Sequence, residues 1–149
     1  VFAFKNYGLK EKYMVKSSNF IGFSIDCCVE NKCKKILLIG HIGKFAKLGC
    51  GIMNTHSHNA DGRIETLVTC GLKVGADLEV ANAVTTDDAI DILKEKGFLE
   101  KTMDLLMEKI YFYINKRSGE MPAEAIVFSN KYGILGKTAG ADEITKELK

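Results

Sequence analysis

Short, continuous apolar runs alternate with amphipathic stretches along this chain. Residues 36–39 form an unbroken apolar run, which is typical of a parallel strand buried on both faces, and residues 125–129 form another near the end. Residues 1–4 and 14–16 predict two shorter strands, and residues 132–135 predict a further extended piece. The pattern therefore predicts a sheet of about four strands.

Apolar residues recur at helical spacing between these runs. Ser18 is a suitable N-cap for the first helix, and Thr85 or Thr86 can cap a later one. The predicted helices cover residues 18 to 31–34, 43–51, 59–72, 77–83, 85 or 86 to 97, 98–116 and 139–148. Because strands separated by helices favour crossover connections, we expect a three-layer α/β fold, with a mostly parallel sheet and helices on both faces.

Size and composition limit the organisation and the partners of the chain. With 149 residues, of which 46% are hydrophobic, it can bury one substantial core, so we expect a single domain over residues 1–149. It opens on Val1 without an initiator Met, and we expect a fragment of a longer two-domain protein. A net charge of +2 does not favour nucleic acid, and no apolar stretch reaches the roughly 20 residues that span a membrane. The five cysteines lack C-x-x-C spacing and are expected to be reduced thiols in a cytoplasmic protein.

A glycine-containing segment follows the apolar run at residues 36–39. Gly40 and Gly43 are expected to let the backbone turn sharply into a helix whose free N–H groups face outward, which suits an anion. The segment is not a P-loop, because it is too short and Phe45 stands where a Ser or Thr would contact magnesium. It also lacks the third glycine of a dinucleotide fingerprint. A ligand-binding turn and a purely structural turn both stay open.

Polar side chains crowd the residues that follow this segment. Ligands of parallel sheets bind beyond the carboxyl ends of the strands, which selects the loops at residues 5–9, 40–44 and 129–133. The candidate binding residues are Asn6, Gly8, Gly40, His41, Gly43, Lys44, Lys47, Asn54, Thr55, His56, Ser57, Asn59, Asp61 and Arg63. His56 and His58 have no third ligand at a recognisable spacing, so no metal site is expected. Asp61 and Glu65 suit a helix first turn as well as catalysis, and no catalytic residue is assigned.

Several of these segments together resemble one known family. The chain contains NYG at residues 6–8, SNFIG at 18–22, GHIGKFAKL at 40–48, GIMNTHS at 51–57 and ADGR at 60–63. This combination resembles the cobalt-precorrin-5B methyltransferase family of anaerobic cobalamin biosynthesis, whose members are more than twice as long. The resemblance runs the length of the chain, which would be their carboxyl-terminal α/β domain. It implies transfer of a methyl group from S-adenosylmethionine to ring carbon C-1 of a cobalt-containing corrin precursor.

The resemblance also implies how ligands are held. The tetrapyrrole substrate carries acetate and propionate carboxylates, which His41, Lys44, Lys47 and Arg63 could meet. Equally, backbone amides at residues 40–43 could hold the carboxylate of the methyl donor. Cobalt would arrive within the substrate, and the missing amino-terminal domain of the same chain would be a partner. We expect the stretches around residues 40 and 56 to meet over one pocket rimmed by cationic side chains.

Two other functions stay open from the residues alone. A non-catalytic α/β module could bind a phosphorylated metabolite at residues 40–44, where Lys44 and the helix amides would face the phosphate. A domain that only mediates subunit contacts would need no ligand. Homo-oligomerisation is open too, because nothing in the sequence fixes the oligomeric state.

Overall fold

The strands of this protein form a small mixed sheet. The computed structural model describes residues 7–149, in which β1 (Ile36–His41), β2 (Ala123–Ser129) and β3 (Gly133–Lys137) lie in the order β1-β2-β3. β1 is parallel to β2, and β3 is antiparallel to β2. The α/β class is confirmed, but the expectation of about four mostly parallel strands is wrong. The strand predicted at residues 1–4 lies outside the described residues.

The strand predicted at residues 14–16 is also wrong. Residues 9–18, which we call the strap, cross the sheet beside β1 and include only a single 3-10 turn, η1 (Glu11–Tyr13). The strap is fixed at its start by the buried Leu9, and Lys10 donates its N–H to the Leu148 carbonyl at 3.5 Å. The Val15 side chain is 90% exposed, so this short apolar pattern reflects no strand buried in the sheet.

The extended piece predicted at residues 132–135 is confirmed as part of β3, but its direction differs from a parallel sheet. Only residues 130–132 separate β2 from β3, and a parallel pair needs a crossover of a dozen or more residues. Gly133 takes a φ of 70°, which L side chains rarely adopt, directly after this turn. The short connection therefore dictates an antiparallel hairpin.

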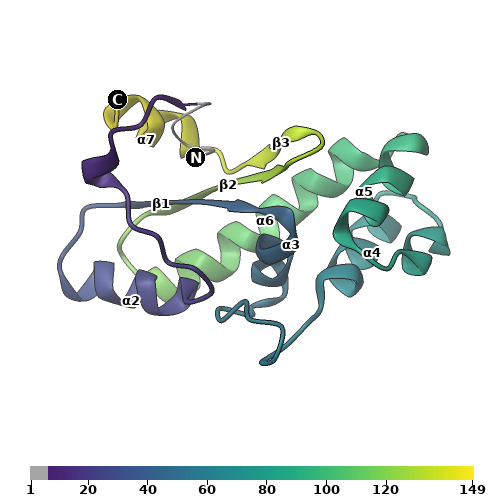
Figure 1. The fold of residues 1–149 in the computed structure, drawn as a ribbon, viewed down its shortest axis with the longest axis horizontal. Helices are drawn as coiled ribbons and strands as arrows, with labels where there is room; N and C mark the ends of the chain where they lie inside the picture. The colour runs from purple at the N-terminus through teal and green to yellow at the C-terminus, as the bar shows by residue number, and fades with distance from the viewer. Residues whose placement is uncertain (1–6) are drawn as a thin grey trace.

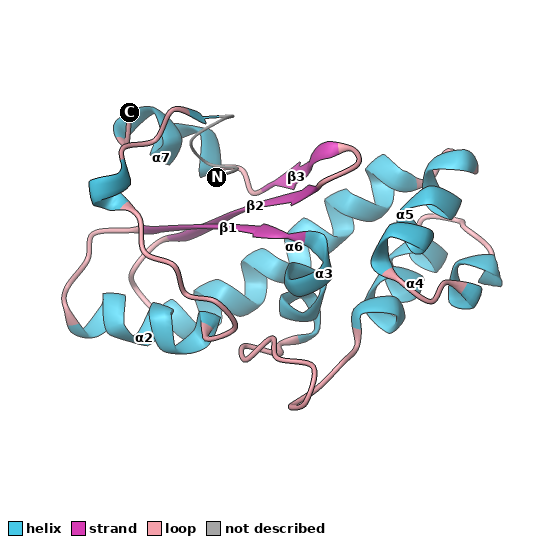
Figure 2. Cartoon of the chain, in the orientation of Figure 1, coloured by secondary structure: helices cyan, strands magenta, loops and turns pink. Residues whose placement is uncertain are grey.

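The predicted helices are confirmed with ends shifted by up to four residues (Figure 2), but the Ser18 cap is wrong, because Phe20 is the N-cap of the first helix. They are α2 (Ile21–Glu30), α3 (Ile42–Phe45) with its 3-10 continuation η2 (Ala46–Cys50), α4 (Arg63–Lys73), η3 (Leu78–Asn82), α5 (Thr86–Glu95), α6 (Leu99–Ser118) and α7 (Ala141–Glu147). Thr85 caps α5, because its hydroxyl accepts the Asp88 N–H while the Asp88 carboxylate accepts the Thr85 N–H. None of the helices within residues 7–149 is long and apolar enough to cross a membrane.

The long helix α6 forms the centre of the core. It packs on β2 and β3 and also contacts α2, α4, α5 and η2, and its Leu106, Ile110 and Ile114 side chains are fully buried. Figure 1 shows α2 and α6 on one side of the strands and α7 on the other. Helices therefore lie on both sides of the sheet, and the strap runs along the more open side.

Gly40 and Gly43 have a different role from the one predicted. Gly40 lies within β1, and neither glycine has a positive φ, so neither is needed for a sharp turn. A Cβ on Gly40 would lie 2.0 Å from Cε1 of Phe45, which shows that the ring packs directly against the strand backbone. Gly40 is thus required for close packing of α3 on β1.

Candidate functional site

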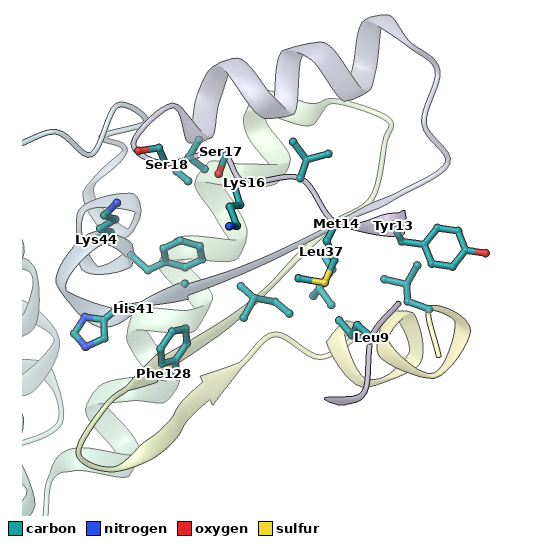
Figure 3. A pocket seen from close by; sticks show the side chains of 16 residues that line it. Leu9, Tyr13, Met14, Lys16, Ser17, Ser18, Leu37, His41, Lys44 and Phe128 are labelled. Atoms are coloured by element: carbon teal, nitrogen blue, oxygen red, sulfur yellow. The ribbon is translucent and has the colours of Figure 1, made fainter. Parts of the chain in front are cut away.

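A hollow of about 600 Å³ lies between the strap and β1 and runs along that strand, from Leu37 to His41 at its carboxyl end (Figure 3). Its walls come from the strap, β1, the start of α3, the end of β2 and the carboxyl-terminal helix. The lining residues are Leu9, Tyr13, Met14, Val15, Lys16, Ser17, Ser18, Ile21, Leu37, Ile39, Gly40, His41, Lys44, Phe45, Phe128 and Leu148. One end of the hollow therefore reaches the edge where ligands bind in α/β sheets.

The floor of the hollow is apolar because of the alternation along β1. Leu37 and Ile39 point to the hollow, whereas Leu38, between them, is buried in the core on the other face. Phe128 of β2 and Phe45 of α3 add aromatic rings to the floor. Such a surface suits a flat apolar ligand better than a small hydrophilic one.

The rim of the hollow is cationic. Lys16 reaches from the strap toward β1, and Lys44 lies on α3 at the end of the hollow near Ser18 (Figure 3). Within the described part of the chain, neither lysine has a carboxylate within 4.0 Å or a side-chain hydrogen bond, although seven other ion pairs form there. Among the described residues that line the hollow there is no Asp or Glu, so both ammonium groups face a ligand space without a counter-charge from residues 7–149.

Three of the predicted binding residues, Gly40, His41 and Lys44, line this hollow. His41 accepts the Gly43 N–H on Nδ1 at 3.1 Å and so caps the short helix α3. Its ring also meets the Phe128 ring edge-on, with centroids 5.7 Å apart. The Gly43 amide is therefore already hydrogen-bonded within the protein.

Lys47 has a structural position. It is 2% exposed, and its Nζ donates to the carbonyls of Thr55 at 3.1 Å and Ala60 at 2.9 Å. The side chain thus reaches under the loop that follows η2 and ties two points of that loop to the core. An ammonium buried in this way does not face the hollow, and Lys47 is absent from its lining.

The predicted residues between 54 and 63 form a separate group, and none of them lines the hollow beside the strap. Thr55 is buried and hydrogen-bonded to Asn19, whereas Ser57 and Asn59 are exposed. His56 is exposed and stacks on His58, with ring centroids 5.1 Å apart. The expected meeting of the stretches around residues 40 and 56 over one pocket is therefore not observed.

Asp61 and Arg63 pair with each other at the start of α4. Arg63 donates from Nε and Nη2 to the two Asp61 oxygens at 2.9 and 2.8 Å, and these bonds hold the pKa of the Asp61 carboxyl well below its usual range. Asp61 borders a second, shallower hollow of about 390 Å³ together with Glu65 and Lys109. This guanidinium is thus already neutralised, unlike the lysines beside the strap.

Two predicted binding residues lie near the start of the chain. Asn6 is outside the described residues, and Gly8 is exposed with a φ of 62° just before the strap. Lys16, Ser17 and Ser18 were not predicted as binding residues, although they line the hollow. Only their place on the strap, seen in three dimensions, brings them near β1.

The described residues offer no clear centre for a metal ion. Within residues 7–149, no group of three or more His, Cys, Asp or Glu side chains is placed to hold one. The polar side-chain groups at the hollow are ammonium and hydroxyl groups together with the His41 imidazole, whose Nδ1 already accepts the Gly43 N–H. Such a set binds anions and hydrogen-bond acceptors.

Comparison with known proteins gives a consistent result. A family profile described as CbiD, C-terminal domain, matches residues 54–139. The chain is 40% identical to a protein of Ruminiclostridium cellulolyticum, 38% to one of Clostridioides difficile and 36% to one of Salmonella arizonae, each named cobalt-precorrin-5B C(1)-methyltransferase. These matches cover 99%, 91% and 99% of this chain but only 41%, 35% and 41% of the relatives, so the chain spans about two fifths of their length. No solved structure matches this chain.

Proposed function

This chain belongs to the CbiD family, and from that premise we propose that it is the carboxyl-terminal domain of a cobalt-precorrin-5B C(1)-methyltransferase. In this proposal residues 1–149 form one α/β domain that works with a further domain of the same polypeptide. The enzyme methylates ring carbon C-1 of a cobalt-containing corrin precursor. The observation that carries the proposal is the family membership over almost the whole chain, joined to a hollow that reaches the carboxyl end of β1.

S-adenosylmethionine is the methyl donor in this proposal. Its sulfonium supplies an already activated methyl group, so the protein has mainly to align donor and acceptor and to exclude water. The residues of this chain would contribute binding and orientation. The apolar floor at Leu37 and Ile39 excludes water from one face of a ligand, and the lysines of the rim fix its charged groups.

A polypeptide with the length of the relatives provides the direct test. It would be incubated with cobalt-precorrin-5B and S-adenosylmethionine, and the product would be examined by mass spectrometry for an added methyl group. We expect methylation that depends on both substrates. A purified, folded protein that binds neither the corrinoid nor S-adenosylhomocysteine would overturn the proposal.

The alternative of a module that binds a phosphorylated metabolite at residues 40–44 has less support. A phosphate site of that kind relies on free amides at the start of a helix. Here the Gly43 amide is bonded to His41, and α3 has only four residues. A phosphorylated metabolite that raises the melting temperature of the protein, with no response to corrinoids, would favour this alternative.

A further inference from the structure

We propose that the hollow between the strap and β1 receives a carboxylate-bearing edge of the corrin macrocycle, and that the methyl donor binds elsewhere. This inference rests on the proposed function and names the ligand of one site within it. The binding residues it assigns are Lys16 and Lys44, with hydroxyl support from Ser17 and Ser18. Lys16 and both serines come from the strap. Lys44 lies more than 20 residues further along the sequence.

Charge is the first argument. Within residues 7–149, Lys16 and Lys44 have no acidic partner, and no carboxylate from this part of the chain lines the hollow. Two like charges held at the rim of an apolar hollow favour an anion that neutralises both. A corrin precursor carries several acetate and propionate groups around its ring, so one molecule can meet both lysines at once.

Shape is the second argument. The floor consists of two aliphatic side chains of β1 with the rings of Phe45 and Phe128. Lys44 stands at one end of the hollow, and Lys16 projects from the strap toward β1 (Figure 3). A macrocycle has the same arrangement in reverse, because its ring is flat and apolar and its carboxylates lie at the periphery. The hollow is only partly enclosed, so it would hold an edge of the macrocycle and leave the rest for a facing surface.

The methyl donor fits this hollow poorly. S-adenosylmethionine carries a positive sulfonium, which two unpaired lysines would repel. Nucleoside sites commonly use an acidic side chain to hold the ribose hydroxyls, and none of the described lining residues is acidic. Among the described residues that line the hollow, there is therefore no acidic group for the donor, whereas there are two ammonium groups for a polycarboxylate.

The ligand should also join two separate parts of the domain. Lys16 lies on the strap and Lys44 on α3, so a molecule bound to both would connect the strap to the end of β1. The strap makes few contacts of its own, since the Val15 and Tyr13 side chains are largely exposed. Binding should therefore slow amide hydrogen exchange in residues 13–18.

The test compares lysine variants in the polypeptide of full family length. The probe is cobyrinic acid, a cobalt corrinoid with free side-chain carboxylates, and binding is measured by calorimetry. Lys16→Ala and Lys44→Ala should each weaken binding by about 3- to 10-fold, since each removes one partly exposed charge-assisted contact. Lys10→Ala is the matched control, because Lys10 lies on the strap but outside the hollow, and its binding should be unchanged. Cobinamide, whose side chains are amides, should bind equally to all of these proteins.

The outcomes separate this inference from the proposed function. Cobyrinic acid that binds equally to the parent protein and to both lysine variants would overturn the inference and leave the methyltransferase assignment standing. Lysine variants that lose affinity for S-adenosylhomocysteine, and not for the corrinoid, would overturn it in favour of the donor. Failure of the parent protein to bind either ligand would instead count against the proposed function itself.

Discussion

Replacing Lys47 with methionine should destabilise the loop that contains Thr55 without affecting the hollow. The change keeps an unbranched side chain as far as Cε and removes the ammonium group that donates to the carbonyls of Thr55 and Ala60. Both hydrogen bonds connect η2 to the loop, so their loss detaches the loop from η2 at Thr55 and Ala60. Lys47 was predicted to bind a ligand, and this substitution separates that role from a structural one.

The expected magnitude follows from the two contacts. A hydrogen bond from a charged donor contributes about 1.5–3 kcal/mol, so the pair contributes roughly 3–6 kcal/mol before other terms. Methionine no longer incurs the cost of burying a charge, which offsets part of this loss. We expect a net decrease of about 2–4 kcal/mol in the free energy of unfolding, or about 5–15 °C in melting temperature for a domain of this size.

Urea denaturation monitored by circular dichroism measures this change, and hydrogen exchange locates it. Exchange should become faster for the amides of Thr55 and Asn59, which donate to Asn19 and His56 in the parent protein. Lys44→Met is the matched control for stability, because Lys44 is exposed and lies three residues away. A loss below about 0.5 kcal/mol for Lys47→Met would refute the structural role, since that is the size of an ordinary surface substitution.

Three further predictions concern the fold around the site. Gly40→Ala places a Cβ 2.0 Å from the Phe45 ring and should lower the free energy of unfolding by about 1–3 kcal/mol, measured by urea denaturation. Thr85→Ala removes the capping box of α5 and should cost about 1 kcal/mol in the same assay. Asp61→Asn should make the free energy of unfolding, measured by urea denaturation at a series of pH values, fall less steeply between about pH 4 and pH 2. The pKa of Asp61 is lower in the folded than in the unfolded chain, so the ionised carboxylate stabilises the fold above about pH 4, and this stabilisation is lost as the pH falls. Because the Asp61 side chain is half exposed, the stabilisation is limited to about 1 kcal/mol.

Each of these three predictions has its own control. The double variant Gly40→Ala with Phe45→Leu should recover part of the stability, and no recovery would mean that the ring is not the source of strain. Thr85→Ser keeps the hydroxyl and should cost less than Thr85→Ala. A fall in the free energy of unfolding between about pH 4 and pH 2 that is identical in Asp61→Asn and in the parent protein would show that the Arg63 pair does not contribute to stability.

The sequence pattern predicted the individual elements better than their assembly. The run at residues 36–39 became β1, and the long amphipathic stretch became α6, because burial of a periodic apolar face is a local property. The number of strands was overestimated, since residues 14–16 have a β-like composition yet pair with no strand. The direction of β3 depended on the length of one turn rather than on apolar pattern.

The candidate site shows why the polar cluster could not be resolved from the sequence. Lys44 and Lys47 are three residues apart and look equivalent along the chain, yet one is exposed at the hollow and the other is buried under a loop. Residues three apart in a helix lie on the same side of it, so the two lysines differ because the loop after η2 folds over Lys47, whose Nζ donates to Thr55 and Ala60, and leaves Lys44 exposed. Local composition carries no information on where that loop folds.

The cationic pair of the hollow illustrates a more general limit. Lys16 and Lys44 come together only because the strap, which is held at Leu9 and continues past Ser18 into α2, is forced to cross the sheet beside β1. The strap therefore gives the hollow one of its walls and one of its charges, although it has little regular structure of its own.

A substitution that loosened the strap at Leu9 would move Lys16 without altering any group of α3. Leu9→Ala should for this reason weaken corrinoid binding about as much as Lys16→Ala, while Lys44→Ala in that background should still reduce it further.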